Sequence, residues 1–287
     1  MTPATSNSHA QRMQRAIGSA RLQTMHVDAR TRIADLYQHA NAKIRVPKHH
    51  GAALEAVLIN TAGGLTGGDI LNWSLIAGPK TRTVVSTQAC ERIYKSAHGA
   101  AQVSTKLDIG DDAHLLWLPQ ETILFEGASL QRSLEADLHP TGRLTAMETI
   151  VMGREAMAET ISQLHFNDRW MVTADDKPVH ADAIRIDQNA LAGLAEQARL
   201  GDHRVFGTLV DIQPSRAPME TQDRQRLVDK MHQTFDDDPS LNLGVSVLGA
   251  KTILRFTART SYDLRQRLPD LLKEMVPNYR LPAVWRL

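Results

Sequence analysis

The stretch from Asn60 to Asp69 (NTAGGLTGGD) is the pattern in this chain that most invites a chemical interpretation. Its glycines are Gly63, Gly64, Gly67 and Gly68. A phosphate-binding Walker A loop carries Lys and then Ser or Thr after its last glycine, so that the ammonium group reaches the phosphates. Here Asp69 stands in place of that lysine, and residues 70–76 look like a strand rather than a helix. The sequence therefore predicts a tight turn with glycines at positive φ, and no nucleotide site.

Cys90 is the only cysteine, which excludes an internal disulfide and a multi-cysteine zinc site within one copy of the chain. Arg92 stands two residues later, and a nearby cation favours the reactive thiolate. A cysteine nucleophile also needs a base that a third group orients, and no histidine lies close in the sequence. We expect a buried, inert cysteine in a strand.

Glu121 and Glu126 are the two acids whose pairing would suggest glycoside chemistry. Because they are five positions apart, they face opposite sides of a regular strand, and a catalytic pair would need a bulge. The twelve histidines are scattered, and the adjacent pair His49–His50 lies in a loop rich in Pro, Lys and Gly. No spacing typical of a tight structural metal site is present.

Alternating charged and apolar residues dominate from Arg21 to about Met152. Lys106 and Asp108, for example, alternate with Leu107 and Ile109, which sends the two kinds of side chain to opposite faces of a strand. Turn signals separate such segments at short intervals. This region is therefore typical of an all-β architecture rather than of βαβ units.

Apolar residues at helical spacing appear only in the last third of the chain. One stripe consists of Leu227, Val228, Met231 and Phe235, and a second of Leu264, Leu268, Leu271, Leu272 and Met275. Ser261 and Asp263 are candidate N-terminal caps of the second helix, in which Pro269 is expected to cause a kink or a later start. Residues 189–199 are a weaker helix candidate. The predicted fold is mainly β, a single β-rich body with about two amphipathic helices in the C-terminal third.

Composition excludes several classes of protein. Lys plus Arg exceed Asp plus Glu by one, 33 against 32, which gives no basic footprint for nucleic acid. No apolar run is long enough for a secretion signal or a membrane span, so we expect a cytoplasmic protein with no membrane contact. Residues 1–18 are polar and aperiodic, which predicts a mobile N-terminal arm before a single domain of residues 19–287.

Four stretches of the chain resemble, in order and spacing, the signature blocks of the urease accessory protein D (UreD) family, called UreH in some bacteria. They are Asn60–Asp69 (NTAGGLTGGD), Ser86–Ser96 (STQACERIYKS), Trp117–Ala128 (WLPQETILFEGA) and Met152–Glu159 (MGREAMAE). Residues 29–31 and 282–285 resemble weaker flanking motifs of the same family. Ala283 departs from the family pattern, because an arginine is common at this position near the C-terminus.

The resemblance implies a β-helix-like fold with two helices and a non-enzymatic role in nickel insertion into urease. In this family the protein binds accessory protein F (UreF), which recruits the GTPase accessory protein G (UreG), and the complex docks on apo-urease. Nickel comes from the metallochaperone UreE and passes through an internal tunnel. The resemblance thus implies nickel in transit and no permanently bound cofactor.

A route that must release nickel is expected to use weak oxygen ligands rather than thiolates. The candidate acids in or beside the signature blocks are Asp69, Glu91, Glu121, Glu148 and Glu155. Each could equally be a solvent-facing or hydrogen-bonded acid. Two other functions stay open from the sequence: an assembly scaffold that never contacts nickel, and a hydrolase that uses Cys90 or the region of Glu121 and Glu126.

Overall fold

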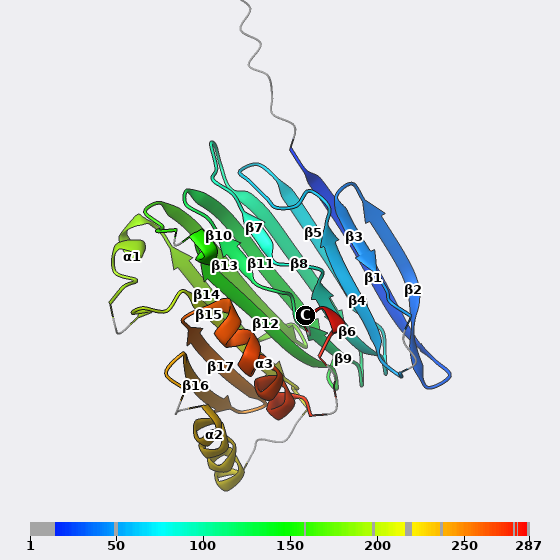
Figure 1. Ribbon diagram of the computed structural model, residues 1–287. Helices are drawn as coiled ribbons and strands as arrows, with labels where there is room; N and C mark the ends of the chain where they lie inside the picture. The colour runs from blue at the N-terminus through cyan, green and yellow to red at the C-terminus, as the bar shows by residue number, and fades with distance from the viewer. Residues whose placement is uncertain are drawn as a thin grey trace, which may run out of the picture.

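The computed structural model shows two β-sheets stacked face to face, with helices packed against the outside of one of them (Figure 1). The structure describes residues 15–48, 51–157, 159–196, 199–215, 220–235, 238–277, 279 and 281–285. The His49–His50 pair and residues 1–14 of the predicted arm lie outside the described residues. The first strand begins at Ile17, within the last part of that arm, and the single domain from residue 19 stays a prediction.

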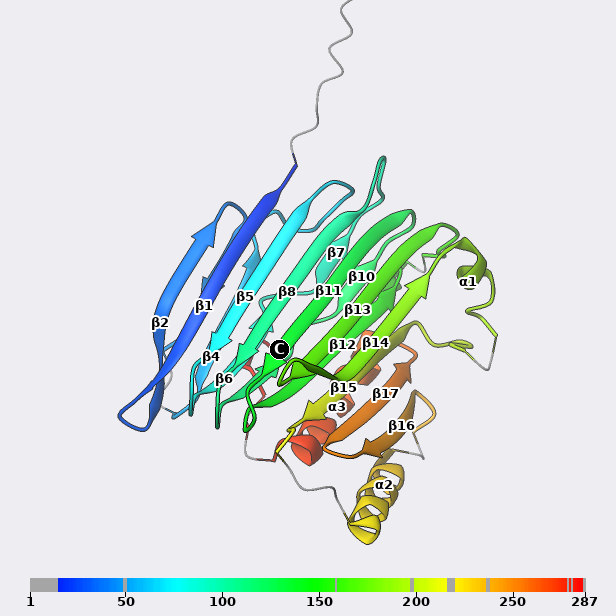
Figure 2. The same ribbon diagram turned by 180° about the vertical axis from the view of Figure 1, so that it is seen from behind.

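The seven-stranded sheet faces the viewer in Figure 2. In spatial order it contains β14 (Lys177–Ile186), β13 (Leu164–Ala174), β11 (Ala128–Leu138), β8 (Ala101–Ile109), β5 (Ile70–Ala77), β1 (Ile17–Val27) and β2 (Arg30–His39). Strands β1, β5, β8, β11 and β13 run parallel to their neighbours, and the outer strands β2 and β14 are antiparallel.

The ten-stranded sheet lies behind it. Its main path contains β16 (Leu241–Leu248), β17 (Lys251–Ala258), β15 (Val205–Ile212), β12 (Arg143–Met152), β9 (His114–Trp117), β6 (Arg82–Thr87), β4 (Leu54–Asn60) and β3 (Ala42–Arg45). The short strand β10 (Thr122–Leu124) lies between β12 and β7 (Glu91–Ile93).

Successive strands pass from one sheet to the other and back. The chain runs from β5 to β6, returns to β8, crosses to β9 and β10, and continues through β11, β12 and β13 in the same manner. Because each turn of this coil adds a strand parallel to the previous one, the fold is β-helix-like, as predicted. The sequence analysis did not predict the five strands after Met152, namely β13 to β17.

Both long helices fall where the apolar stripes predicted them: α2 (Thr221–Phe235) and α3 (Ser261–Met275). Neither candidate cap of α3, Ser261 or Asp263, is its N-cap. The N-cap is Thr260, and Asp263 takes part as its partner in a capping box. Pro269 lies inside α3. The short elements are α1 (Gln188–Ala192), η1 (Glu155–Met157) and η2 (Ala283–Trp285). In the described part of the chain, no helix has the length and apolar character needed to cross a membrane.

The hydrophobic residues form two layers. One layer fills the space between the sheets, and the other lies between the ten-stranded sheet and the helices α2 and α3. Strand β12 contributes to both layers, since Ala146 belongs to the first and Met147 to the second. A charged side chain that points between the sheets therefore lies in a largely apolar layer.

The glycine loop is a structural turn, as predicted. Gly63, Gly64 and Gly68 have φ values of 77°, 149° and 88°, in the region that disfavours other residues. Gly67 is needed for a different reason: a Cβ atom there would overlap the hydroxyl oxygen of Ser96 and nearby carbonyl oxygens. The loop is thus held by positive φ at three glycines and by close backbone packing at the fourth.

Candidate functional site

Two charged side chains occupy inward positions of the seven-stranded sheet. Every second residue of β11 points into the molecule, and Arg132 takes such a position between two buried leucines. Asp168 does the same on β13, between Phe166 and Trp170. The parallel register places Arg132 directly beside Asp168. Burying either charge alone would be costly, so the register creates a pair.

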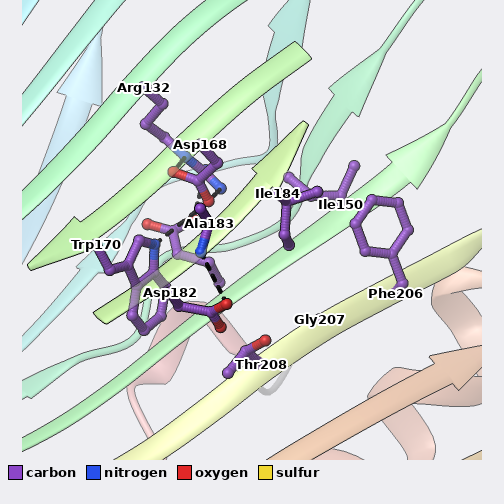
Figure 3. A pocket seen from close by; sticks show the side chains of 11 residues that line it. Arg132, Ile150, Asp168, Trp170, Asp182, Ala183, Ile184, Phe206, Gly207 and Thr208 are labelled. Carbon is purple, nitrogen blue, oxygen red and sulfur yellow. Dashed lines mark hydrogen bonds and ion pairs between the residues drawn. The ribbon is translucent and has the colours of Figure 1, made fainter. Parts of the chain in front are cut away.

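The guanidinium group of Arg132 bridges the two sheets. Its Nε and Nη2 atoms donate to the two carboxylate oxygens of Asp168, at 3.0 and 2.7 Å. Its Nη1 atom donates across the interior to Glu148 Oε2 at 2.6 Å and to the hydroxyl oxygen of Thr122 at 3.1 Å. Arg132 and Asp168 point toward one another in Figure 3. Four charge-assisted hydrogen bonds therefore fix this side chain.

Glu148 of β12 is the acid on the opposite sheet. Its second oxygen accepts a hydrogen bond from Trp117 Nε1 at 2.9 Å. Burial raises the pKa of Glu148 to about 7, although the Arg132 guanidinium acts in the opposite direction. Burial also opposes the charge of Arg132, but Asp168 and Glu148 raise the pKa of the guanidinium above its ordinary value. The interior thus holds one cation between two acids.

Two small cavities meet at this group, because both are lined by Arg132 and Glu148. The first cavity, which we call the inner chamber, has a volume of about 50 Å³ and extends to Glu91 of β7. Asn60 Nδ2 donates to Glu91 Oε1 at 3.0 Å, which ties this acid to the start of the glycine loop. Burial raises the pKa of Glu91 to about 7. The chamber is large enough for a few water molecules.

The side chains that line the second cavity, which we call the outer chamber, include Arg132 and are drawn in Figure 3. Its volume of about 10 Å³ is close to the space of a single water molecule. Asp168, Asp182 and Thr208 line it. Asp182 forms an ion pair of 2.9 Å with Arg255, whose side chain is largely exposed. Acidic groups therefore follow one another from Glu91 through the interior to the surface at Asp182.

Carboxylate oxygens are the ligands that suit a divalent cation held loosely and released again. Across the described ranges, no three His, Cys, Asp or Glu side chains are gathered closely enough to hold a metal ion. The acids that line the chambers are therefore spaced along the interior and do not form a closed coordination site.

Comparison with known proteins identifies the family. The family model described as "UreD urease accessory protein" matches residues 16–286. The urease accessory protein UreD of Rhizobium etli is 40% identical over 278 residues, which cover 97% of this chain and 98% of the relative. Proteins of the same name from Chelativorans sp. (40% identical, 96% of this chain, 95% of the relative) and Agrobacterium fabrum (37%, 96% and 93%) agree. This chain belongs to the UreD family of urease accessory proteins.

In this UreD-family chain, only two of the five predicted acids line the chambers: Glu91 and Glu148. The carboxylate of Asp69 instead accepts from the backbone N–H groups of Ala16 and Thr66, at 2.9 and 2.8 Å. It closes the glycine loop and fastens the chain before β1.

The other two predicted acids contact helix α3. Glu155 Oε1 accepts from the backbone N–H and the hydroxyl group of Ser261, at 2.8 and 2.9 Å. Glu121 is fully buried and forms a two-pronged ion pair with Arg265, at 2.7 and 2.6 Å. Both acids therefore fasten α3 to the sheet. Nickel contact at these residues and at Asp69 stays a prediction.

The alternative catalytic groups do not converge. Cys90 is half-buried and directly precedes β7, not inside a strand as expected, and its Sγ atom donates to Glu121 at 3.2 Å. Burial raises the pKa of the thiol to about 12, with Glu121 acting in the same direction. Glu126 binds Ser162, so it has a separate partner from Glu121. A protonated thiol and two separately bonded acids do not form a nucleophile or an acid pair.

Three charged residues of the site were missed from the sequence: Arg132, Asp168 and Asp182. A signal existed for the first two, because each is a charge at an apolar position of an alternating strand. Such a charge indicates a buried partner. Asp182 carries no comparable signal, since β14 alternates weakly.

Proposed function

We propose that this UreD-family chain is a non-enzymatic chaperone of urease maturation that carries nickel through its interior. The observation that supports this is the succession of acids along the two chambers, in which Glu148 and Asp168 are buried and Glu91 and Asp182 are half-buried. Desolvation raises the pKa of both Glu91 and Glu148 to about 7, so the charged forms of these two acids are unfavourable for folding. We explain their presence by the binding of a divalent cation that passes through the interior.

The proposed cycle takes place in the cytoplasm. The chain binds UreF, UreF recruits the GTPase UreG, and the assembly docks on apo-urease. Nickel supplied by UreE enters at one end of the acidic line, passes the chambers and leaves toward the urease active site. The chain itself holds no permanent cofactor in this cycle.

The test uses amide variants that keep shape and hydrogen-bonding capacity while removing charge. Glu91→Gln and Glu148→Gln chains are co-expressed with urease and the other accessory proteins, and the nickel content and activity of the purified urease are measured. At an effective dielectric constant of about 20, a unit charge and a divalent ion ~4 Å apart interact by roughly 8 kcal/mol before desolvation. We therefore expect less nickel and lower activity, with pull-down of UreF and urease retained.

Glu135→Gln is the matched control, because Glu135 is on β11 but exposed, in an ion pair with Lys106. It removes the same charge without touching the chambers. Variants at Glu91 and Glu148 that fold, bind partners and yield fully loaded urease would contradict the nickel route. They would support the scaffold function in its place.

A hydrolase function is disfavoured by the protonated Cys90 thiol and by the separate partners of Glu121 and Glu126. Purified chain incubated with GTP is expected to show no turnover. Turnover that persists after contaminating GTPases are removed would contradict the non-enzymatic assignment.

A further inference from the structure

Arg132 occupies the boundary between the inner and outer chambers. Its side chain is buried, and both chambers are lined by it. The guanidinium is anchored on one sheet by two bonds to Asp168 and on the other by one bond to Glu148 and one to Thr122. The two chambers therefore meet at a fixed positive charge.

This charge is incompatible with a divalent cation at the same place. The guanidinium repels the ion, and it also occupies oxygens of Glu148 and Asp168 that would be the ion's ligands. Since the remaining oxygen of Glu148 accepts from Trp117, every carboxylate oxygen of Glu148 and Asp168 already accepts a hydrogen bond in this arrangement, and an incoming ion must compete with these donors.

Arg132 makes two hydrogen bonds to Asp168 but only one to Glu148. This difference indicates how the boundary between the two chambers opens. Asp168 is in register beside Arg132 on the neighbouring strand and holds it with two prongs. Glu148 is on the opposite sheet and is bound by a single Nη1 atom. A rotation of the guanidinium group can release Glu148 while one hydrogen bond to Asp168 is kept. Release of Asp168 would instead break two hydrogen bonds.

We propose that Arg132 is a charge gate on the interior route: it separates the chambers while bonded to Glu148, and a divalent cation passes by displacing it and binding the carboxylates of Glu148 and Asp168. This gate rests on the proposed nickel route. The gate also selects divalent over monovalent ions. A monovalent ion carries no more charge than the guanidinium group that it must displace, and it forms fewer strong bonds with the carboxylates.

The test is nickel binding to the isolated chain, measured by calorimetric titration with Ni²⁺ alone. Wild-type protein is compared with Arg132→Gln, which removes the competing cation and leaves both acids. We expect Arg132→Gln to bind Ni²⁺ about tenfold more tightly or better, and its melting temperature to rise more with Ni²⁺ than that of wild type. The double variant Arg132→Gln with Glu148→Gln is expected to lose this gain, which identifies the ligand.

Arg21→Gln is the matched control, because it removes one positive charge from the exposed ion pair with Asp35. It should leave Ni²⁺ affinity unchanged. If Arg132→Gln does not fold, Arg132→Lys keeps a cation but loses the forked geometry, and its Ni²⁺ affinity should lie above that of wild type. A purely structural arginine would lower stability in these variants without raising Ni²⁺ affinity, and that result overturns the gate.

The gate and the route fail in distinguishable ways. Unchanged Ni²⁺ affinity in the Arg132 variants refutes the gate, whatever the Glu91→Gln and Glu148→Gln chains do to urease. Normal nickel loading of urease by those amide variants refutes the nickel route. It also refutes the gate, because the gate depends on that route.

Discussion

Replacing Glu91 with Gln should stabilise the protein at neutral and alkaline pH. The amide retains an oxygen that can accept the hydrogen bond from Asn60, so the change removes charge with little change of shape. Burial raises the pKa of Glu91 from 4.5 to about 7. The folded state therefore binds the proton more tightly than the unfolded state, and the stability of wild type falls as pH rises between these two values.

The size of the effect follows from the same two pKa values. At roughly 1.4 kcal/mol per pH unit, a pKa raised from 4.5 to about 7 corresponds to about 3 kcal/mol. Because Glu91 is only half-buried, solvent screening reduces this to about 1–3 kcal/mol. The full penalty is present above about pH 7 and absent below about pH 4.5, where both states bind the proton.

Urea denaturation of wild type and Glu91→Gln at several values between about pH 5 and pH 8 measures this difference. The free energy of unfolding of the variant minus that of wild type should grow with pH and level off above 7. Glu135→Gln, at an exposed position, should show no such trend. A difference for Glu91→Gln that stays constant across the series would refute the raised pKa of Glu91 and would remove one support of the proposed nickel route.

Three further outcomes are expected. Gly67→Ala should lower the free energy of unfolding by about 1–3 kcal/mol through collision with Ser96 and the neighbouring backbone, and a melting temperature equal to wild type would contradict this packing. Cys90→Ala should support full urease activation in co-expression, because the thiol is protonated; lost activity in a stable variant would contradict an inert cysteine. Arg265→Met should destabilise by about 3 kcal/mol in urea, because Glu121 loses its two-pronged partner, and added Glu121→Gln should restore part of the loss.

The sequence alone was sufficient for features that depend on local periodicity and on short motifs. Alternation of Lys106 and Asp108 with apolar neighbours fixes the two faces of β8, because side-chain direction in a strand repeats every two residues. The apolar stripes of α2 and α3 are local in the same sense. The glycine spacing predicted positive φ, which three of the four glycines adopt. The signature blocks were sufficient to identify the family, which the comparisons confirm.

The tertiary structure decided which acids line the interior chambers. A sequence gives the charge of a residue, but not the distant group that occupies its oxygens. Asp69 is bonded to Ala16, 53 residues away, and Glu155 to Ser261, 106 residues away. Glu121 is bonded to Arg265 at a separation of 144 residues. These three acids resembled Glu91 and Glu148 in the sequence, yet only the last two line the chambers.

The group of Arg132, Asp168 and Glu148 could not be predicted from the sequence either, because it depends on the register between strands. Arg132 meets Asp168, 36 residues later, because β11 and β13 align in one parallel register, and it reaches Glu148 because the two sheets stack. A shift of one residue in either strand would turn these charges to the outer face. Alternation fixes the faces of each strand, but only the packing of the whole coil sets two acids around one buried cation.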